Sequence, residues 1–220
     1  MKRVMQLFIA ICLFQLTVQN ANAQPFKNDI ALFKQRDSVL PPPQNAILFI
    51  GSSSFTKWTN MQEAFPLFPI INRGFGGSTL PDVILYANDI IFPYKPKQII
   101  IYCGDNDIAF SDTITAEIVL ERFKQLYSLI RSRLKYTEID FVSVKPSPSR
   151  WKFKPVMEAS NRLIRQFILQ QSHANFIDVY HAMLDEKGNV REDLFIEDKL
   201  HMNAKGYAIW TQIISKYLLQ

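Results

Sequence analysis

The sequence predicts an α/β fold in which helices cover both faces of a central, mostly parallel sheet of about five strands. First, short apolar runs without polar alternation recur along the chain, which is typical of strands buried on both faces of a sheet. Second, longer amphipathic segments alternate with these runs, as helices do around parallel sheets. Third, 220 residues with 48% hydrophobic and 20% charged side chains are enough for one well-filled core.

The strands are expected at five apolar runs, which cover residues 46–50, 68–71, 98–103, 139–144 and 176–179. The third run contains consecutive β-branched residues from Ile99 to Ile101, a composition that favours strands. Four helices are expected between the runs, at residues 80–91, around 119–130, at 156–169 and at 206–219. Ser78 or Thr79 caps the first, and in the second, apolar residues at helical spacing predict one buried stripe.

The N-terminus is typical of a secretory signal peptide. Lys2 and Arg3 precede an apolar run over residues 4–18, and Ala21 and Ala23 form a cleavage site of small residues. The alternative is a membrane anchor, but the run is short for a span and contains two glutamines. We therefore expect export to the periplasm or the cell exterior, with no stable membrane span after the signal peptide is removed.

The sequence divides into a signal peptide (1–23), a polar lead-in that ends in three prolines (24–45) and one domain (46–220). After cleavage, 23 basic residues face 20 acidic ones, so the net charge of about +3 does not indicate a nucleic-acid partner. One cysteine, Cys103, is left, which excludes an internal disulfide. No Cys/His spacing of the metal-binding kind is present, so no metal is expected.

Polar, glycine-containing loops follow each of the first three predicted strands, at residues 51–54, 72–77 and 104–107. In open α/β sheets, ligands bind at the carboxyl ends of the strands, so these loops are expected to form one site. A dinucleotide site is not indicated. The first loop lacks the glycine pattern, and the second begins with Gly-x-Gly but does not complete it.

The same loops, together with a segment near the C-terminus, offer the groups that a serine hydrolase needs. A serine at the tip of the first strand is an exposed hydroxyl, which needs a neighbouring base to become a nucleophile. Asp198 precedes His201 by three residues, so its carboxylate can fix the tautomer of the imidazole. Gly77 can present a bare N–H group, and Asn106 can add an amide donor for a negative oxygen.

The four segments resemble, in order and spacing, the conserved blocks of the SGNH hydrolases, also called GDSL esterases. The blocks are Gly51-Ser52-Ser53, Asn72-Arg73-Gly74-Phe75-Gly76-Gly77, Gly104-Asp105-Asn106-Asp107 and Asp198-Lys199-Leu200-His201. The resemblance covers the chain from about residue 46 onwards. It implies a three-layer α/β/α sandwich similar to flavodoxin, and hydrolysis of esters, thioesters or carbohydrate O-acetyl groups without a metal or other cofactor.

The resemblance implies a role for each matching residue. Ser53 matches the nucleophile, His201 the general base and Asp198 the acid that orients it. The backbone N–H groups of Ser53 and Gly77 and the side chain of Asn106 match the donors of the oxyanion hole. Neighbouring residues are the alternatives at three positions: Ser52 as nucleophile, Glu197 as acid, and Gly74 or Gly76 as backbone donor.

This chain departs from the family at one position, where Ser52 replaces the usual aspartate of Gly-Asp-Ser. That aspartate is a supporting residue, so its loss does not exclude catalysis. A stiff, proline-containing loop follows the fourth predicted strand and carries Arg150 and Trp151. It is either a rigid connector or a wall of the substrate pocket in which one of these two residues contacts substrate.

These observations predict an exported serine esterase. The preferred substrate is a small-molecule or glycan ester with a short acyl group, such as acetate on a carbohydrate. This preference comes from the resemblance and from export. The alternatives are a non-catalytic glycan-binding module, an O-acetyltransferase and a lysophospholipase-type acylhydrolase on the same scaffold.

Overall fold

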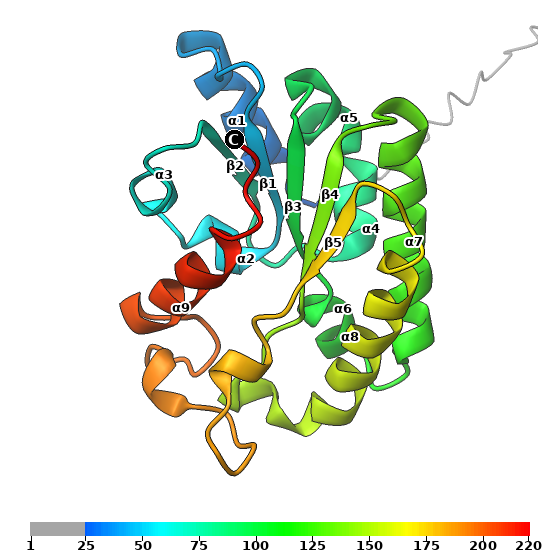
Figure 1. The fold of residues 1–220 in the computed structure, drawn as a ribbon, viewed down its shortest axis with the longest axis vertical. Helices are drawn as coiled ribbons and strands as arrows, with labels where there is room; N and C mark the ends of the chain where they lie inside the picture. The colour runs from blue at the N-terminus through cyan, green and yellow to red at the C-terminus, as the bar shows by residue number, and fades with distance from the viewer. Residues whose placement is uncertain (1–24) are drawn as a thin grey trace, which may run out of the picture.

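The computed structural model describes residues 25–220 and contains one five-stranded sheet in which every neighbouring pair is parallel (Figure 1). The strands are β1 (Ile47–Gly51), β2 (Ile70–Gly74), β3 (Gln98–Tyr102), β4 (Glu138–Val142) and β5 (Ala174–Ile177). Their order is β2-β1-β3-β4-β5, which is the order of flavodoxin-like sheets. The predicted fold class is confirmed, and the predicted signal peptide lies outside the described residues.

The helices that the sequence predicts are present. The first forms two short helices, α4 (Leu80–Leu85) and α5 (Ala87–Ile90), separated by a bend at Tyr86. The other three are α7 (Ala116–Arg133), α8 (Lys154–Ile168) and α9 (Ala204–Ile214). Thr79 is the N-cap of α4 and forms a capping box with Asp82.

Several short elements were not predicted from the sequence. They are the helices α2 (Ser53–Thr56), α3 (Met61–Ala64) and α6 (Asp105–Phe110), and the 3-10 turns η1 (Phe92–Tyr94), η2 (Pro148–Phe153), η3 (His181–Met183) and η4 (Glu192–Leu194). The predicted polar lead-in also contains a helix, α1 (Lys27–Val39), whose Ile30 and Phe33 are buried in the core. An ion pair between Asp37 and Arg73 joins α1 to β2.

The register of the central strands places the first three loops at one level. Gly51, the last residue of β1, pairs with Gly74 of β2 on one side and with Tyr102 of β3 on the other. The three strands therefore end together, toward the bottom of Figure 1, where α6 follows β3. This register brings together three loops that lie far apart in the sequence.

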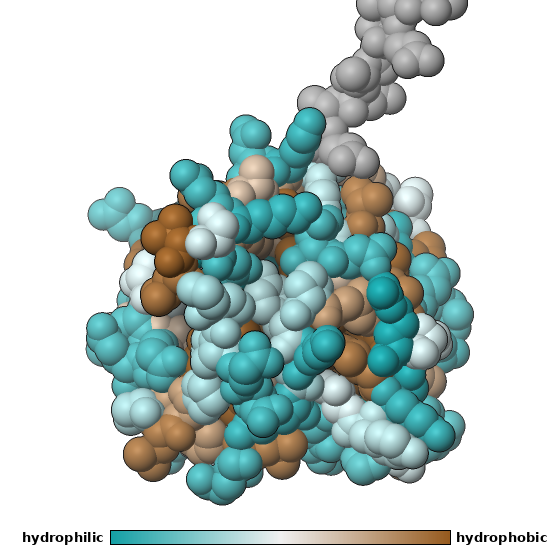
Figure 2. Space-filling model, turned by 90° about the horizontal axis from the view of Figure 1, so that it is seen from above, coloured by the Kyte–Doolittle hydropathy of each residue, from teal (hydrophilic) through white to brown (hydrophobic). Residues whose placement is uncertain are grey.

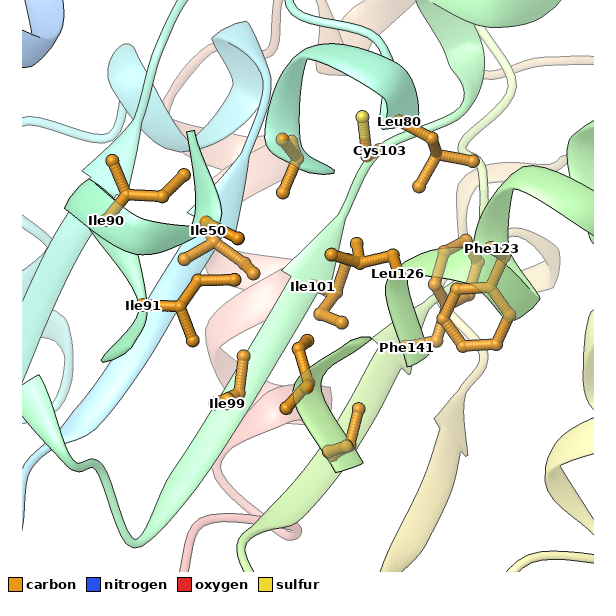
Figure 3. Close-up of a cluster of buried hydrophobic side chains, with 14 of the residues drawn as sticks. Ile50, Leu80, Ile90, Ile91, Ile99, Ile101, Cys103, Phe123, Leu126 and Phe141 are labelled. Carbon is orange, nitrogen blue, oxygen red and sulfur yellow. The ribbon is translucent and has the colours of Figure 1, made fainter. Parts of the chain in front are cut away.

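One face of the sheet is covered by α1, α4, α5, α7 and α8, which bury a mainly aliphatic core (Figures 1 and 3). The strands contribute Ile50, Ile99 and Ile101, and α7 contributes Phe123 and Leu126. Phe123 packs edge-to-face on Phe141 of β4, with ring centroids 4.7 Å apart. The predicted buried stripe of α7 therefore faces the sheet.

The opposite face is covered by α2, α3 and α9 over an aromatic core. Trp210 of α9 packs edge-to-face against Tyr102 of β3 at 4.9 Å and against Phe55 of α2 at 6.1 Å, measured between ring centroids. The Tyr207 hydroxyl of α9 also donates a 2.9 Å hydrogen bond to the Ser54 carbonyl oxygen. These contacts fix the last helix of the chain against the first helix after β1.

The surface carries few large apolar areas in the view from above. Apolar residues form small, separate groups among hydrophilic ones on this face (Figure 2). Within residues 25–220, no helix is both long enough and apolar enough to span a bilayer.

Gly51 makes the sharp exit from β1 possible, and its replacement by alanine is expected to lower the free energy of unfolding by at least about 3 kcal/mol. Its φ is +131°, and a Cβ atom there would lie 1.8 Å from the Tyr102 carbonyl oxygen. Gly188 is the matched control, because its φ is +76° but nothing lies within 4 Å of its Cβ position. Gly188→Ala should cost only about 1 kcal/mol of backbone strain. If urea denaturation showed the same loss of unfolding free energy for both variants, this explanation would be contradicted.

Candidate active site

Ser53 lies at the carboxyl end of β1, where the chain turns from the sheet into α2. The Ser52 N–H donates a 3.0 Å hydrogen bond to the Tyr102 carbonyl oxygen, which extends the contact with β3 by one residue. Ser52 is buried, and Ser53 is the first residue of α2 and half-buried. The turn therefore presents the hydroxyl of Ser53, rather than that of Ser52, at the surface.

Asp198 and His201 lie in a closed loop just before α9. The Lys199 N–H donates to the Ile196 carbonyl oxygen, and the Ile196 N–H donates to the His201 carbonyl oxygen, each at 2.9 Å. Lys199 adopts a φ of +54°, which makes the loop tight. Asn203 then caps α9 by accepting hydrogen bonds from the N–H groups of Lys205 and Gly206.

The structure brings the three predicted catalytic side chains into one chain of hydrogen bonds. Ser53 Oγ lies 3.0 Å from His201 Nε2, and His201 Nδ1 lies 2.6 Å from Asp198 Oδ2. The other carboxylate oxygen of Asp198 accepts 2.9 Å hydrogen bonds from the backbone N–H groups of Leu200 and His201. The imidazole is 15% exposed and the carboxylate 43% exposed, so solvent reaches the site.

The same hydrogen bonds determine the charge of Asp198. Burial alone would raise its pKa, but the backbone N–H and ring of His201 and the N–H of Leu200 outweigh this and hold the pKa at about 2. The carboxylate is therefore ionised at neutral pH. An ionised carboxylate on Nδ1 holds the ring proton there and leaves Nε2 free to accept a proton from Ser53.

The predicted backbone donor lies in the turn between β2 and α4. Gly77 has a φ of +87°, a conformation that favours glycine. A Cβ atom at Gly76 would lie 3.9 Å from Ser53 Cβ, whereas a Cβ atom at Gly77 would lie 3.9 Å from the ring of Phe26. Among the described residues, neither glycine N–H has a hydrogen-bond partner, so both Gly76 and Gly77 stay candidates for the donor.

Asn106, the predicted side-chain donor, lies in the first turn of α6. Its Nδ2 donates a 2.9 Å hydrogen bond to the Ser78 carbonyl oxygen, which leaves the second hydrogen of the amide unused. Its Oδ1 accepts a 2.8 Å hydrogen bond from Arg150 Nη2. Arg150 thus contacts a predicted site residue, whereas Trp151 packs against Lys154, whose Nζ lies 4.7 Å from the indole centroid.

Ser78 joins the three loops, a role that the sequence analysis missed. Its buried hydroxyl donates a 3.0 Å hydrogen bond to the Gly51 carbonyl oxygen of the first loop. Its own carbonyl oxygen accepts from Asn106 of the third loop, and Ser78 directly follows the last residue of the second loop. Asp107 adds a further link, since its buried carboxylate accepts from the Leu80 N–H and pairs with Arg122.

Ser78→Ala is expected to lower the free energy of unfolding by about 1 kcal/mol, the contribution of a typical buried hydrogen bond. The turnover number should fall several-fold, because the loop that carries the glycine donors loses its contact with the loop that carries Ser53. Ser132→Ala is the matched control, since this exposed hydroxyl donates a 2.8 Å bond to the Leu129 carbonyl oxygen. Wild-type stability and turnover in Ser78→Ala would contradict the linking role.

The arrangement can perform acyl transfer through a serine. It combines a hydroxyl, a base in contact with it, a carboxylate that orients the base, and nearby amide donors. Cys103 is buried behind the site, and burial raises the pKa of its thiol well above the usual value, so it is not a competing nucleophile. Among residues 25–220, no group of three or more His, Cys, Asp or Glu side chains is placed to hold a metal ion.

Comparisons with known proteins agree with this chemistry. The sequence profile of the GDSL-like Lipase/Acylhydrolase family matches residues 50–209. A search of curated protein sequences finds no match.

Solved structures share the fold at low identity. A GDSL-like lipase from Bacteroides thetaiotaomicron is 17% identical with a TM-score of 0.71, over 86% of this chain and 96% of that one. A protein of Bacteroides fragilis assigned as an acylhydrolase is 19% identical with a TM-score of 0.73, over 89% and 95% of the two chains. An acetylxylan esterase from Geobacillus stearothermophilus, solved as a catalytic mutant, is 15% identical with a TM-score of 0.62, over 80% and 94%.

The profile match covers all four loop segments and ends within α9. The fold, the strand-end position of the site and this match lead to the same assignment. The chain belongs to the GDSL-like lipase/acylhydrolase family and is a serine hydrolase that acts on ester bonds.

Proposed function

We propose that the chain is an exported serine esterase that removes a short acyl group, such as acetate, from a carbohydrate. The observation that carries the catalytic part is the unbroken hydrogen-bond chain from Ser53 Oγ through His201 to Asp198. A non-catalytic binding module would not need a base held within 3.0 Å of an accessible serine hydroxyl.

In the first half-reaction, Ser53 Oγ attacks the ester carbonyl carbon and its proton passes to His201 Nε2. The imidazolium is stabilised by Asp198, which accepts the Nδ1 hydrogen bond. The carbonyl oxygen becomes negative and receives hydrogen bonds from the Ser53 N–H, from Gly77 or its neighbour Gly76, and from the unused hydrogen of Asn106. One such donor contributes about 3–4 kcal/mol in hydrolases.

The intermediate then collapses. The bond between the carbonyl carbon and the alcohol oxygen breaks, and the alcohol leaves with the proton from His201 Nε2. A water molecule gives its proton to the same nitrogen and attacks the acyl-serine. The acid departs, and the proton returns to Ser53 Oγ.

The substrate class rests on two observations. The N-terminal segment has the composition of a secretory signal peptide, so the enzyme would meet extracellular or periplasmic material. A structure with the same fold is an acetylxylan esterase, which gives a carbohydrate acetate as a precedent on this scaffold. A glycan acetate is therefore the substrate that we test first.

The nucleophile is tested with a fluorophosphonate, which reacts with activated serines. We expect the intact mass of the protein to rise by one probe, and peptide mapping to place the probe on Ser53. Ser53→Ala should stay unmodified. A probe on Ser52, or equal labelling of the variant, would refute the proposed nucleophile.

The substrate is tested with acetylated xylooligosaccharides, a lysophospholipid and an acetyl thioester, each with and without an added acceptor sugar. Release of free acetate from the oligosaccharide at the highest kcat/KM supports the proposal. Acetylation of the acceptor sugar would instead identify a transferase, and preference for the lysophospholipid would identify a lipid substrate.

A further inference from the structure

The guanidinium of Arg150 lies against the side chain of Asn106. Its Nη2 donates a 2.8 Å hydrogen bond to Asn106 Oδ1, and its Nη1 lies 3.1 Å from Asp105 Oδ2. The Arg150 side chain is only 16% exposed. It comes from η2, which lies beside α6 at the carboxyl edge of the sheet (Figure 1).

These contacts fix the orientation of the Asn106 amide. A guanidinium can only donate, so the group that faces Arg150 must be the amide oxygen. The Ser78 carbonyl can only accept, so the group that faces it must be the amide nitrogen, at 2.9 Å. The two neighbours therefore fix the amide orientation and leave the second hydrogen of the NH₂ group without a protein partner among the described residues.

Arg150 also changes the strength of that donor. A hydrogen bond from a cation to the amide oxygen draws electron density away from the nitrogen, and linked hydrogen bonds strengthen one another in this way. The NH₂ group then donates more strongly to a negative oxygen, whose charge develops only during the reaction. The contact should accordingly affect turnover more than substrate binding.

A buried set of charges holds Arg150 in place. Asp105 pairs with Arg150 and also with Lys145, whose Nζ lies 3.7 Å from the same carboxylate oxygen and whose side chain is 1% exposed. Ser149, next to Arg150, donates a 3.0 Å backbone hydrogen bond to the Lys199 carbonyl oxygen. The loop of Arg150 is therefore attached both to the third loop of the site and to the loop that carries His201.

The same set contacts position 52, where this chain departs from the usual Gly-Asp-Ser pattern. Ser52 Oγ lies 3.4 Å from the other oxygen of Asp105, in a fully buried position. Next to the nucleophile this chain therefore has a neutral hydroxyl, and the nearby carboxylate is that of Asp105, which pairs with Arg150 and Lys145.

We propose that Arg150 is a positioning residue that acts on the reaction through Asn106, holding and polarising the amide of the oxyanion hole, rather than by contact with substrate. The proposal rests on the proposed esterase function. This role differs from both alternatives for the loop that carries Arg150 and Trp151, which were a rigid connector and a pocket wall in which one of the two residues contacts substrate.

The test is a double-mutant cycle that combines Arg150→Ala with Asn106→Ala, with p-nitrophenyl acetate as substrate. We expect Arg150→Ala to lower kcat about 10- to 100-fold with little change in KM, as expected for weakening one oxyanion donor without removing it. In the Asn106→Ala background, Arg150→Ala should change kcat less than about threefold, because the group through which it acts is gone.

Two variants separate positioning from folding. Arg150→Met keeps the packing of the aliphatic stem, and it should lower kcat by the same factor as Arg150→Ala. Arg131→Ala is the matched control, since this guanidinium donates 2.8 Å hydrogen bonds to the carbonyl oxygens of Lys135 and Thr137, away from the site. It should lower thermal stability and leave kcat unchanged.

Three outcomes would overturn the proposal: multiplicative effects of the two substitutions, a rise in KM at constant kcat, or wild-type kcat in Asn106→Ala. The first two would instead indicate that Arg150 contacts substrate directly. Failure of the underlying function is recognised separately. If Ser53→Ala hydrolyses the ester as fast as the wild type, the esterase proposal itself fails, whatever the cycle shows.

Discussion

Ser53→Ala is expected to lower kcat for a short-chain nitrophenyl ester by roughly 10⁴- to 10⁶-fold, the range that loss of a serine nucleophile produces in known hydrolases. The reason is that Ser53 Oγ is the hydroxyl in contact with His201 Nε2, at 3.0 Å. Without it, no acyl-enzyme forms, and only the amide donors around the site would assist attack by water. The measurement is steady-state kinetics on purified variants with matched circular dichroism spectra.

We expect His201→Ala to lower kcat by about the same factor as Ser53→Ala. In the double variant, the two losses should not multiply. If the proposed role of the imidazole is to accept the proton of Ser53, its removal from a variant that already lacks the serine should lower kcat little further. We therefore expect Ser53→Ala, His201→Ala and the double variant to have similar residual rates. A double variant slower than both by the product of the single effects would show that the two side chains do not act as a unit.

Ser54→Ala is the control for substitution at this turn. Ser54 follows the nucleophile directly and is buried, and its backbone carbonyl, which the substitution leaves in place, accepts the Tyr207 hydrogen bond. The variant should retain wild-type kcat. A loss as large as that of Ser53→Ala would assign the effect to disruption of α2 rather than to loss of the nucleophile.

The strand-end loops could be predicted from the sequence because the strands of a parallel sheet all run in the same direction. Each buried strand appears as an apolar run, and its carboxyl end must lie at the same edge as those of its neighbours. The sequence therefore predicts that Ser53 and Asn106 lie at the same edge of the sheet. The structure adds the register, in which Gly51 pairs with both Gly74 and Tyr102.

Helix α1 could not be predicted in the same way, because its sequence is polar and only two of its residues, Ile30 and Phe33, are buried in the core. Its stability comes from packing on α5 and from the ion pair between Asp37 and Arg73, which are 36 residues apart. Propensity and periodicity do not report contacts of this kind.

The supporting residues of the site were missed for a related reason. The sequence analysis gives Ser78 as a possible helix cap and assigns no individual role to Asp105 or Lys145. Their roles come from partners that lie far away in the sequence, such as Gly51 for Ser78 and Arg150 for Asp105. For Lys145, the sequence offers one indication of a role in the site. It follows the carboxyl end of β4, at the edge of the sheet where the other site residues lie.

The geometry of an Asp–His pair alone does not distinguish His201 from His181. The segment Asp178 to His181 repeats the same spacing, and Asp178 Oδ2 lies 2.7 Å from His181 Nδ1, almost the distance found between Asp198 and His201. The two pairs differ in their surroundings: His181 is 78% exposed, whereas His201 Nε2 faces Ser53. The aromatic contacts of α9 with α2 create that difference.

Asp198→Asn is expected to lower kcat by roughly 10³- to 10⁴-fold, similar to the loss that the corresponding change causes in serine proteases. The asparagine oxygen can still accept from the N–H groups of Leu200 and His201, so the loop should keep its shape. Its NH₂ group would face His201 Nδ1, which must then accept, and the ring proton moves to Nε2. That nitrogen would donate to Ser53 instead of taking its proton.

The pH dependence of the wild type provides a second measurement on the same residue. Because the pKa of Asp198 is about 2, its carboxylate stays ionised through the weakly acidic range. Protonation of this carboxylate should therefore add no step to the acid limb of kcat/KM down to about pH 3. A second step between pH 3 and pH 5 would show that the carboxylate is not held in its ionised form.

Asp178→Asn is the matched control, because it makes the same chemical change in a pair with the same spacing and nearly the same hydrogen-bond length. It should leave kcat and its pH profile unchanged, since no hydrogen bond joins the His181 ring to a serine within residues 25–220. If the two substitutions lowered kcat equally, the effect would follow from altering an Asp–His turn in general. If only Asp198→Asn lowers it, the function of the pair depends on the packing of α9 that places His201 on Ser53.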